Sequence, residues 1–139
     1  MAGAEATVND DFLQIPRYKP RWINGTAAFR EAHRSVLTAL AGRTIAATFV
    51  LWDLQRDEHF TEGPVILVVD GLGPVEVCAN KFDELSLTLG LIDIDQPVRW
   101  DWDEEPWHFE WRRDAIPILR RVVGCQIRAN NPPCVASVH

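Results

Sequence analysis

The stretch VRWDWDEEPWHFEWR, residues 98–112, contains four of the six tryptophans of the chain and predicts its best-defined element. Apolar and polar residues alternate on both sides of residues 103–106. Such alternation is typical of strands with one buried and one solvated face. Residues 103–106 consist of three acids and a proline, a composition that favours a turn. We therefore expect a β-hairpin with a four-residue loop at 103–106.

Folding the segment at this loop gathers its large apolar residues on one face. The expected cross-strand partners there are Trp102 with Trp107, Trp100 with Phe109, and Val98 with Trp111. The opposite face pairs Asp101 with His108 and Arg99 with Glu110. Each complementary pair of this kind contributes about 0.2–1 kcal/mol. A slip of one residue would turn every side chain to the wrong face, so the alternation indicates a well-specified register.

The residues before the hairpin predict one helix and four further strands. Apolar residues at helical spacing between Thr26, a suitable N-cap, and Gly42, a suitable C-cap, predict a helix over residues 26–41. Apolar runs predict strands at 45–52, 65–69, 75–78 and 85–91. The first is apolar on both faces, which indicates a central strand. The last alternates leucines with Ser86 and Thr88, which indicates one solvated face.

The residues after the hairpin predict a short helix over 114–123, with Pro117 in its first turn and Gly124 at its end, and then a strand at 125–129. The expected fold is α+β: a twisted, mostly antiparallel sheet of six to seven strands, with the main helix packed on one face. The expected organisation is an N-terminal arm at 1–23, a single domain at 24–130 and a C-terminal tail at 131–139.

The composition is that of a single globular domain. The 139 residues are 47% hydrophobic and 24% charged, with a formal net charge of −6. That charge argues against general affinity for nucleic acid or anionic membranes. Because no apolar run is long enough to span a bilayer and the first 24 residues lack a signal-peptide pattern, we expect a cytoplasmic protein. Cys78 is expected to be buried, and Cys125 and Cys134 could pair only in an oxidising setting.

Motifs for catalysis and cofactor binding are not found in the sequence. Asp70-Gly71-Leu72-Gly73 resembles the start of a dinucleotide loop, but a strand follows where a helix is required. There is no Gly-Lys-Ser/Thr phosphate loop and no G-x-S-x-G nucleophile turn. We therefore expect no catalytic residues, no cofactor and no metal. One alternative stays open: His59, His108 and Asp101 could form a metal- or ligand-dependent enzyme site if two loops meet.

Charge is unevenly distributed along the chain. Residues 93–110 contain seven acids and one base, whereas residues 17–43 contain six bases and one acid, and residues 112–128 contain five bases and one acid. An acidic loop on a rigid hairpin would attract a basic partner, although charged tips also serve only to keep sheet edges soluble. We expect a non-catalytic binding or inhibitor protein, similar to a bacterial immunity protein for a basic toxin or nuclease. A structural assembly subunit is the other alternative. The expected partner-binding residues are Asp101, Asp103, Glu104, Glu105, His108, Glu110 and Trp52.

Overall fold

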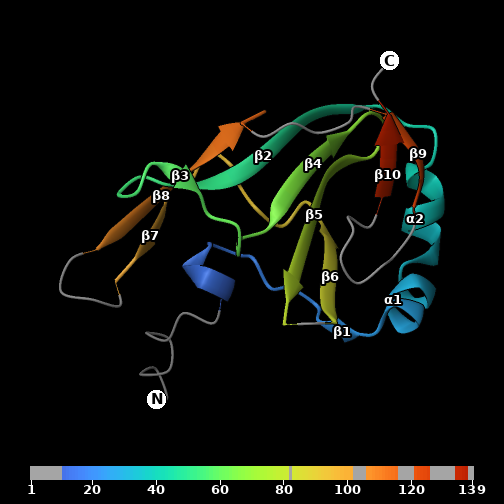
Figure 1. Cartoon of the computed structure of the whole chain (residues 1–139), viewed down its shortest axis with the longest axis horizontal. Helices are drawn as coiled ribbons and strands as arrows, with labels where there is room; N and C mark the ends of the chain where they lie inside the picture. Colours follow the sequence, from blue (N-terminus) through green and yellow to red (C-terminus); the bar gives the residue numbers. More distant parts are fainter. Residues whose placement is uncertain (1–10, 82, 102–105, 116–120, 126–133, 138–139) are drawn as a thin grey trace.

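The computed structural model describes residues 11–81, 83–101, 106–115, 121–125 and 134–137 (Figure 1). After a 3-10 turn at Phe12–Gln14, two helices follow, α1 at Thr26–Ala32 and α2 at Arg34–Leu40. The strands are β1 Ile23–Asn24, β2 Ile45–Asp53, β3 Glu58–His59, β4 Val65–Val69, β5 Gly73–Asn80, β6 Glu84–Leu89, β7 Val98–Trp100, β8 Trp107–Arg113, β9 Arg121–Cys125 and β10 Cys134–Ser137.

Eight of these strands form one antiparallel sheet. Its order is β1-β6-β5-β4-β2-β8-β7, with β3 paired to one end of β2. The predicted α+β class and antiparallel sheet are therefore confirmed. The sheet has one strand more than the upper expectation, because β1 and β3 contain two residues each and are too short to show alternation. Strand β2 is central, as predicted, since it pairs with β4 on one side and with β8 on the other.

The predicted helix over 26–41 is divided into α1 and α2. The backbone of His33 leaves the helical region, with φ −114° and ψ 23°, and its ring contacts the ring of Phe29 at a centroid distance of 4.8 Å. Gly25, with φ 89°, precedes the first turn in place of the expected Thr26 cap. The sequence does not reveal the break, because Phe29, Leu37 and Leu40 all pack into one cluster.

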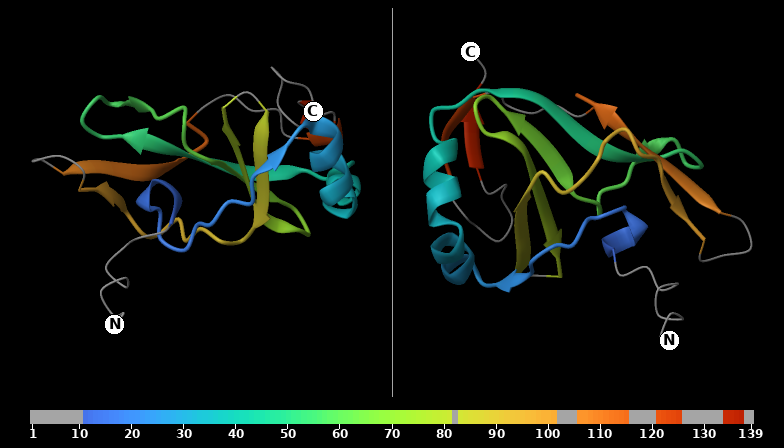
Figure 2. Two further views of the ribbon diagram at one scale, coloured as in Figure 1. Left: turned by 90° about the horizontal axis from the view of Figure 1, so that it is seen from below. Right: turned by 180° about the vertical axis from the view of Figure 1, so that it is seen from behind.

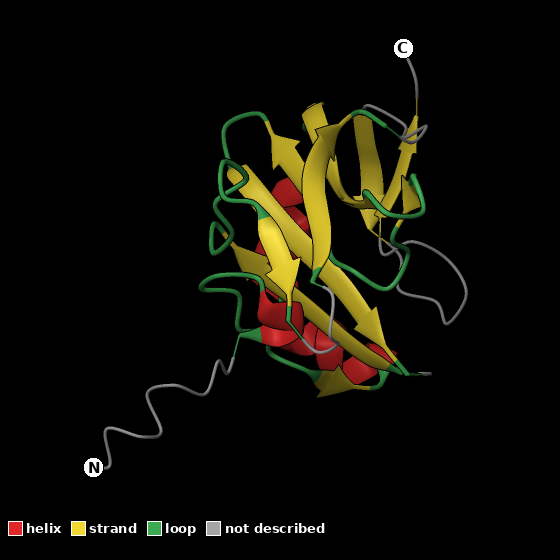
Figure 3. Ribbon diagram, turned by 90° about the vertical axis from the view of Figure 1, so that its left-hand side faces the viewer, coloured by secondary structure: helices red, strands yellow, loops and turns green. Residues whose placement is uncertain are grey.

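The sheet separates two apolar clusters. On one face, α1 and α2 cover residues of β2, β4, β5 and β6 with Phe29, Leu37 and Leu40 (Figures 1 and 2). On the other face, Ile15 and Tyr18 of the N-terminal segment are fully buried against side chains of β2, β4, β5, β7 and β8. The view along the sheet in Figure 3 shows the helices behind the strands. Among the described residues, no helix combines the length and apolarity required to cross a membrane.

The N-terminal segment buries the face of β6 that was expected to be solvated. The predicted solvated face of this strand is wrong: Ser86 is fully buried, and its hydroxyl accepts the Arg21 N–H at 2.9 Å. The Thr88 hydroxyl donates to the buried Glu76 carboxylate at 2.6 Å. Leu89, expected to face the core, is 47% exposed. The physical reason is that the N-terminal segment packs against this face and donates the Arg21 N–H to Ser86, which the alternation alone cannot reveal.

The C-terminal prediction also requires correction. Arg121–Cys125 is a strand, β9, paired with β10, so the helix predicted over 114–123 does not extend through Val123. Gly124 lies within β9 and is not a helix cap. Val122 and Val123 are β-branched and favour a strand once a partner strand is available. Strand β10 falls within residues 131–139, and residues 126–129 of the predicted last strand lie outside the described residues.

Candidate functional site

The Trp-rich hairpin forms, with a register different from the expected one. The observed partners are Trp100 with Trp107, Arg99 with His108, and Val98 with Phe109. The prediction paired Trp100 with Phe109 and is therefore displaced by two residues. A displacement of two keeps every side chain on its predicted face, so alternation cannot distinguish these registers. The segment between the paired strands consequently comprises residues 101–106, of which 102–105 lie outside the described residues.

The inner side of the hairpin is an aromatic cluster, as predicted. Trp100 and Phe109 are buried, with ring centroids 4.5 Å apart. Phe60 contacts both rings, at 5.1 Å from Trp100 and 5.3 Å from Phe109. Trp107 stacks on Trp100 with an interplanar angle of 21°. Large rings in such contact bury 150–250 Å² each, so the hairpin is firmly anchored to the sheet.

The turn after β2 braces the hairpin from the side. The buried carboxylate of Asp53 accepts the backbone N–H groups of Gln55 and Arg56, at 2.9 and 3.1 Å. This pattern is typical of an Asx turn, and it ends the strand. The Gln55 side chain then accepts the His108 N–H at 3.1 Å and donates to the Pro106 carbonyl at 3.3 Å. Two side chains thus fix the turn and the start of β8 together.

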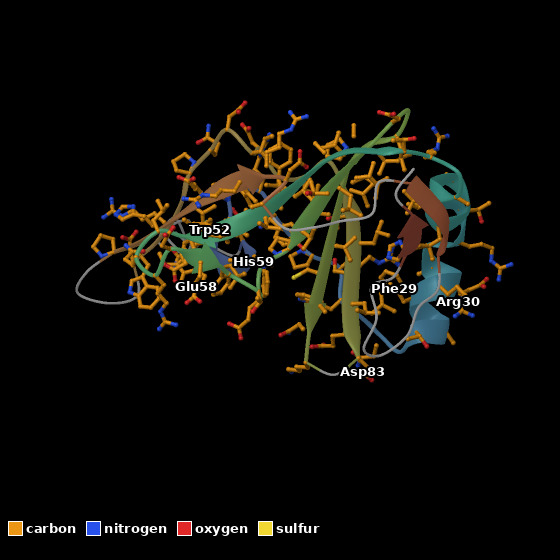
Figure 4. The ribbon with its side chains drawn as sticks, turned by 45° about the horizontal axis from the view of Figure 1, so that its top comes forward. Phe29, Arg30, Trp52, Glu58, His59 and Asp83 are labelled. Carbon is orange, nitrogen blue, oxygen red and sulfur yellow. The ribbon has the colours of Figure 1, made fainter. Side chains whose placement is uncertain are left out.

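Trp52 lies on the outer side of this brace. The sheet register places it between His59 of β3 and Glu110 of β8, and directly paired residues share a face. Its indole N–H donates to the Asp57 carboxylate at 3.0 Å, and the Arg112 guanidinium lies 4.4 Å from the ring centroid. The ring is partly exposed, and its orientation is fixed by these two contacts. Figure 4 shows Trp52, Glu58 and His59 at one end of the molecule, far from α1.

We call the side chains on this outer side the hairpin face. It is formed by side chains from β2, β3 and β8 together with β7 and the residue after it, namely Trp52, His59, His108, Glu110, Arg112, Arg99 and Asp101. The helices lie over the opposite end of the sheet (Figure 1). The sequence placed His108, Glu110 and Asp101 on one face of the hairpin, and the structure adds Trp52 beside them.

Ion pairs within the hairpin face neutralise part of its acidic charge. Arg112 donates to Glu110 at 2.8 Å and lies 3.8 Å from Asp57. Arg99 donates to Asp101 at 2.9 Å. Because these side chains are well exposed, each pair contributes little to stability. The local excess of acid on the described strands is therefore smaller than the count for residues 93–110 implied.

The two histidines of the alternative metal or enzyme site are not brought together. His59 belongs to β3 and His108 to β8, and β2 lies between these strands. The register pairs Trp52 with His59 on one side and with Glu110 on the other, so the two histidines are not neighbours in the sheet. Burial lowers the pKa of His59, which favours the neutral imidazole. Within the described ranges, no group of three His, Cys, Asp or Glu side chains could hold a metal ion.

The remaining predicted partner-binding residues, Asp103, Glu104 and Glu105, lie outside the described residues. Sequence reasoning missed three side chains that organise the site, namely Gln55, Asp57 and Arg112. The polar run after Trp52 was a signal for a turn, but it did not show which strand the turn would contact. The β2–β8 pairing joins residues about 60 positions apart, and no local pattern in the sequence specifies it.

Comparisons with protein-family models, with curated proteins and with solved structures find no match to this chain.

Proposed function

We propose that this chain is a non-catalytic binding protein that docks a basic partner protein through its hairpin face and the acidic loop 101–106. The partner class that fits best is a basic toxin or nuclease, which the chain would inhibit by occlusion, as a bacterial immunity protein does. The proposed setting is the bacterial cytoplasm. The observation that supports the proposal most directly is a partly exposed Trp52, fixed in orientation and surrounded by charged side chains.

Trp52 has the properties of a residue that contributes strongly to binding. Tryptophan and arginine are the residue types most enriched among such positions, and here they are stacked on one another. The hydrogen bond to Asp57 and the brace through Gln55 hold the surface in one conformation before a partner arrives. Little conformational entropy is then lost on association. A strand scaffold also positions side chains more precisely than a loop does.

The acidic charge of the loop favours a partner with a basic surface. The acids at 103–105 lie in the six-residue segment that follows β7 and precedes β8. Complementary charge accelerates encounter and orients the partner. Trp52 and the loop would then have separate roles, the ring contributing affinity and the loop contributing steering and specificity for a basic surface.

The test begins by capturing partners from the source organism on the immobilised full-length chain, and then measures the affinity of the purified partner. The decisive variant is Trp52→Ala. Removal of a central ring from an interface costs about 2 kcal/mol or more, which corresponds to a loss of affinity of roughly 30-fold or greater. Trp52→Phe retains a ring without the indole N–H and should lose less.

Leu89→Ala is the matched control. Leu89 is 47% exposed on β6, away from the hairpin face, so removing it truncates a large apolar side chain elsewhere on the surface. We expect its affinity to equal that of the wild type. Equal affinity for Trp52→Ala and the wild type, in a variant whose circular dichroism and melting temperature are normal, would rule out the hairpin face as the docking site.

A further inference from the structure

The two-stranded sheet at the C-terminal end places two cysteines opposite each other. Strands β9 and β10 are antiparallel, and the register begins with Cys134 facing Cys125. The next pair is Val135 with Gly124. The cysteines are nine positions apart in the chain, so the pairing of these strands closes a short loop. Neither residue has a place in the proposed function.

The backbone geometry of this pair suits a covalent bond. Directly opposed residues of antiparallel strands have Cα atoms about 4.5 or 5.5 Å apart, depending on the hydrogen-bonding pattern. Disulfides occupy Cα separations of about 4.4–6.8 Å. We propose that Cys125 and Cys134 form an intramolecular disulfide that ties β9 to β10 when the protein meets a small-molecule disulfide such as oxidised glutathione.

The reaction proceeds by thiol–disulfide exchange. The thiolate of one cysteine attacks a sulfur of oxidised glutathione, which forms a mixed disulfide and releases one glutathione thiolate. The second cysteine thiolate then attacks the protein sulfur of that mixed disulfide, and the second glutathione leaves. The two protein thiols lose two protons and two electrons, and one oxidised glutathione becomes two reduced glutathione molecules.

Cys78, the third cysteine, is excluded from this chemistry by its surroundings. It lies on β5 with 3% of its surface exposed, and burial raises the pKa of its thiol to about 11. Because the thiolate is the attacking species, this cysteine reacts slowly at neutral pH. It therefore serves as an internal reference in the experiment, a thiol that should remain free.

The experiment uses the full-length chain, reduced and then equilibrated with oxidised glutathione. After thiol blocking under denaturing conditions, the number of titratable thiols should fall from three to one. Trypsin cleaves after Arg121 and Arg128, which separates Cys125 in peptide 122–128 from Cys134 in peptide 129–139. Without reduction, mass spectrometry should find these two peptides as one linked species, with Cys78 in a peptide carrying the blocking group.

Matched variants complete the test. Cys78→Ser should form the 122–128 to 129–139 linkage as the wild type does, and Cys125→Ser should not form it. Three blocked thiols after oxidation, stable mixed disulfides with glutathione at both C-terminal cysteines, linkage to Cys78 or linkage between chains would each overturn the proposal.

Discussion

Glu76 shows that the pattern of a strand does not by itself decide whether a polar side chain is buried. It is fully buried on β5, where its carboxylate accepts the Thr88 hydroxyl and the Ile92 N–H, at 2.6 and 2.8 Å. A buried carboxyl group is tolerated only when its oxygens are hydrogen-bonded. The sequence predicted a strand at 75–78, but it did not show whether the side chain of Glu76 would be buried. The N-terminal segment that covers it, not the strand pattern, makes it internal.

Replacing Glu76 should therefore be costly. We expect Glu76→Ala to lower the free energy of unfolding by about 2–4 kcal/mol, because it leaves a buried N–H and a hydroxyl without their acceptor and opens a cavity. Glu76→Gln keeps an acceptor and should lose less. Urea denaturation measures the difference, with the exposed Glu58→Ala expected to stay within about 0.5 kcal/mol of the wild type. A Glu76→Ala protein as stable as the wild type would contradict the assigned hydrogen bonds.

His33 introduces a pH dependence at the break between the helices. Its ring is buried, and Nε2 has no hydrogen-bond partner among the residues that the structure describes. Burial, and secondly the nearby Arg21 charge, lower the pKa of His33 in the folded protein. The unfolded chain, with a histidine pKa of about 6.5, then binds more protons than the folded one. The contribution of His33 to stability is therefore complete above the pKa of the unfolded chain. It decreases as the pH falls towards the pKa that His33 has in the folded protein.

The expected observation is a smaller free energy of unfolding at pH 5 than at pH 7, with a weaker pH dependence in His33→Gln. His59, whose pKa burial also lowers, contributes in the same direction, so His33→Gln should reduce the slope without abolishing it. Denaturant titrations at several pH values measure both slopes. Identical slopes for the wild type and the His33→Gln variant would show that His33 is protonated equally in both states.

At the scale of elements, the hairpin shows what alternation can specify. The faces of Trp100, Phe109 and His108 followed from the pattern of the sequence, because a period of two assigns each residue to a side. The pattern did not determine the register: Trp100 pairs with Trp107 across the strands, whereas the expected partner was Phe109. Contacts with Phe60 and the Gln55 brace favour the observed register, and both come from outside the hairpin.

Engineered cysteine pairs distinguish the two registers. In a Cys78→Ser, Cys125→Ser, Cys134→Ser background, we expect Arg99→Cys with His108→Cys to form a disulfide, since these positions are directly opposed. The pair Asp101→Cys with His108→Cys, opposed only in the register expected from the sequence, should crosslink poorly. Non-reducing peptide mapping reports both. Efficient crosslinking of the second pair alone would mean that the hairpin has the register predicted from alternation.

The elements that sequence reasoning missed depend on distant partners. The helix predicted up to Val123 gives way to β9, whose partner β10 lies in the segment expected to be a tail. The break at His33 leaves the apolar spacing of 26–41 intact, so a single helix was the simpler expectation. In contrast, the positions of β2 and β4 were visible locally, because continuous apolar runs are typical of central strands. The tertiary context decides wherever a local pattern permits two structures.

At the scale of the whole molecule, the helices and the hairpin face lie at different ends of the sheet. The helices pack at the end formed by β4, β5 and β6, and the hairpin face lies at the other, with Arg30 and Asp83 far from Trp52 and His59 (Figure 4). The formal net charge of −6 hides this asymmetry. Binding through the hairpin face and loop 101–106 should therefore depend on where the acids lie in the chain and not on the net charge alone.

The salt dependence of partner binding tests this claim most directly. We compare the wild type with two triple variants that both reach a formal net charge of zero, since three charge reversals add six units to −6. One variant is Asp103→Lys, Glu104→Lys and Glu105→Lys, and the other is Glu31→Lys, Asp70→Lys and Asp83→Lys, three exposed positions outside the hairpin face. Dissociation constants are measured for the purified partner at low and high salt.

The loop variant should bind at least about tenfold more weakly at low salt and lose most of its salt dependence, while the other variant stays within about threefold of the wild type. Equal effects of the two variants, or unchanged binding by the loop variant, would contradict docking through the acidic hairpin.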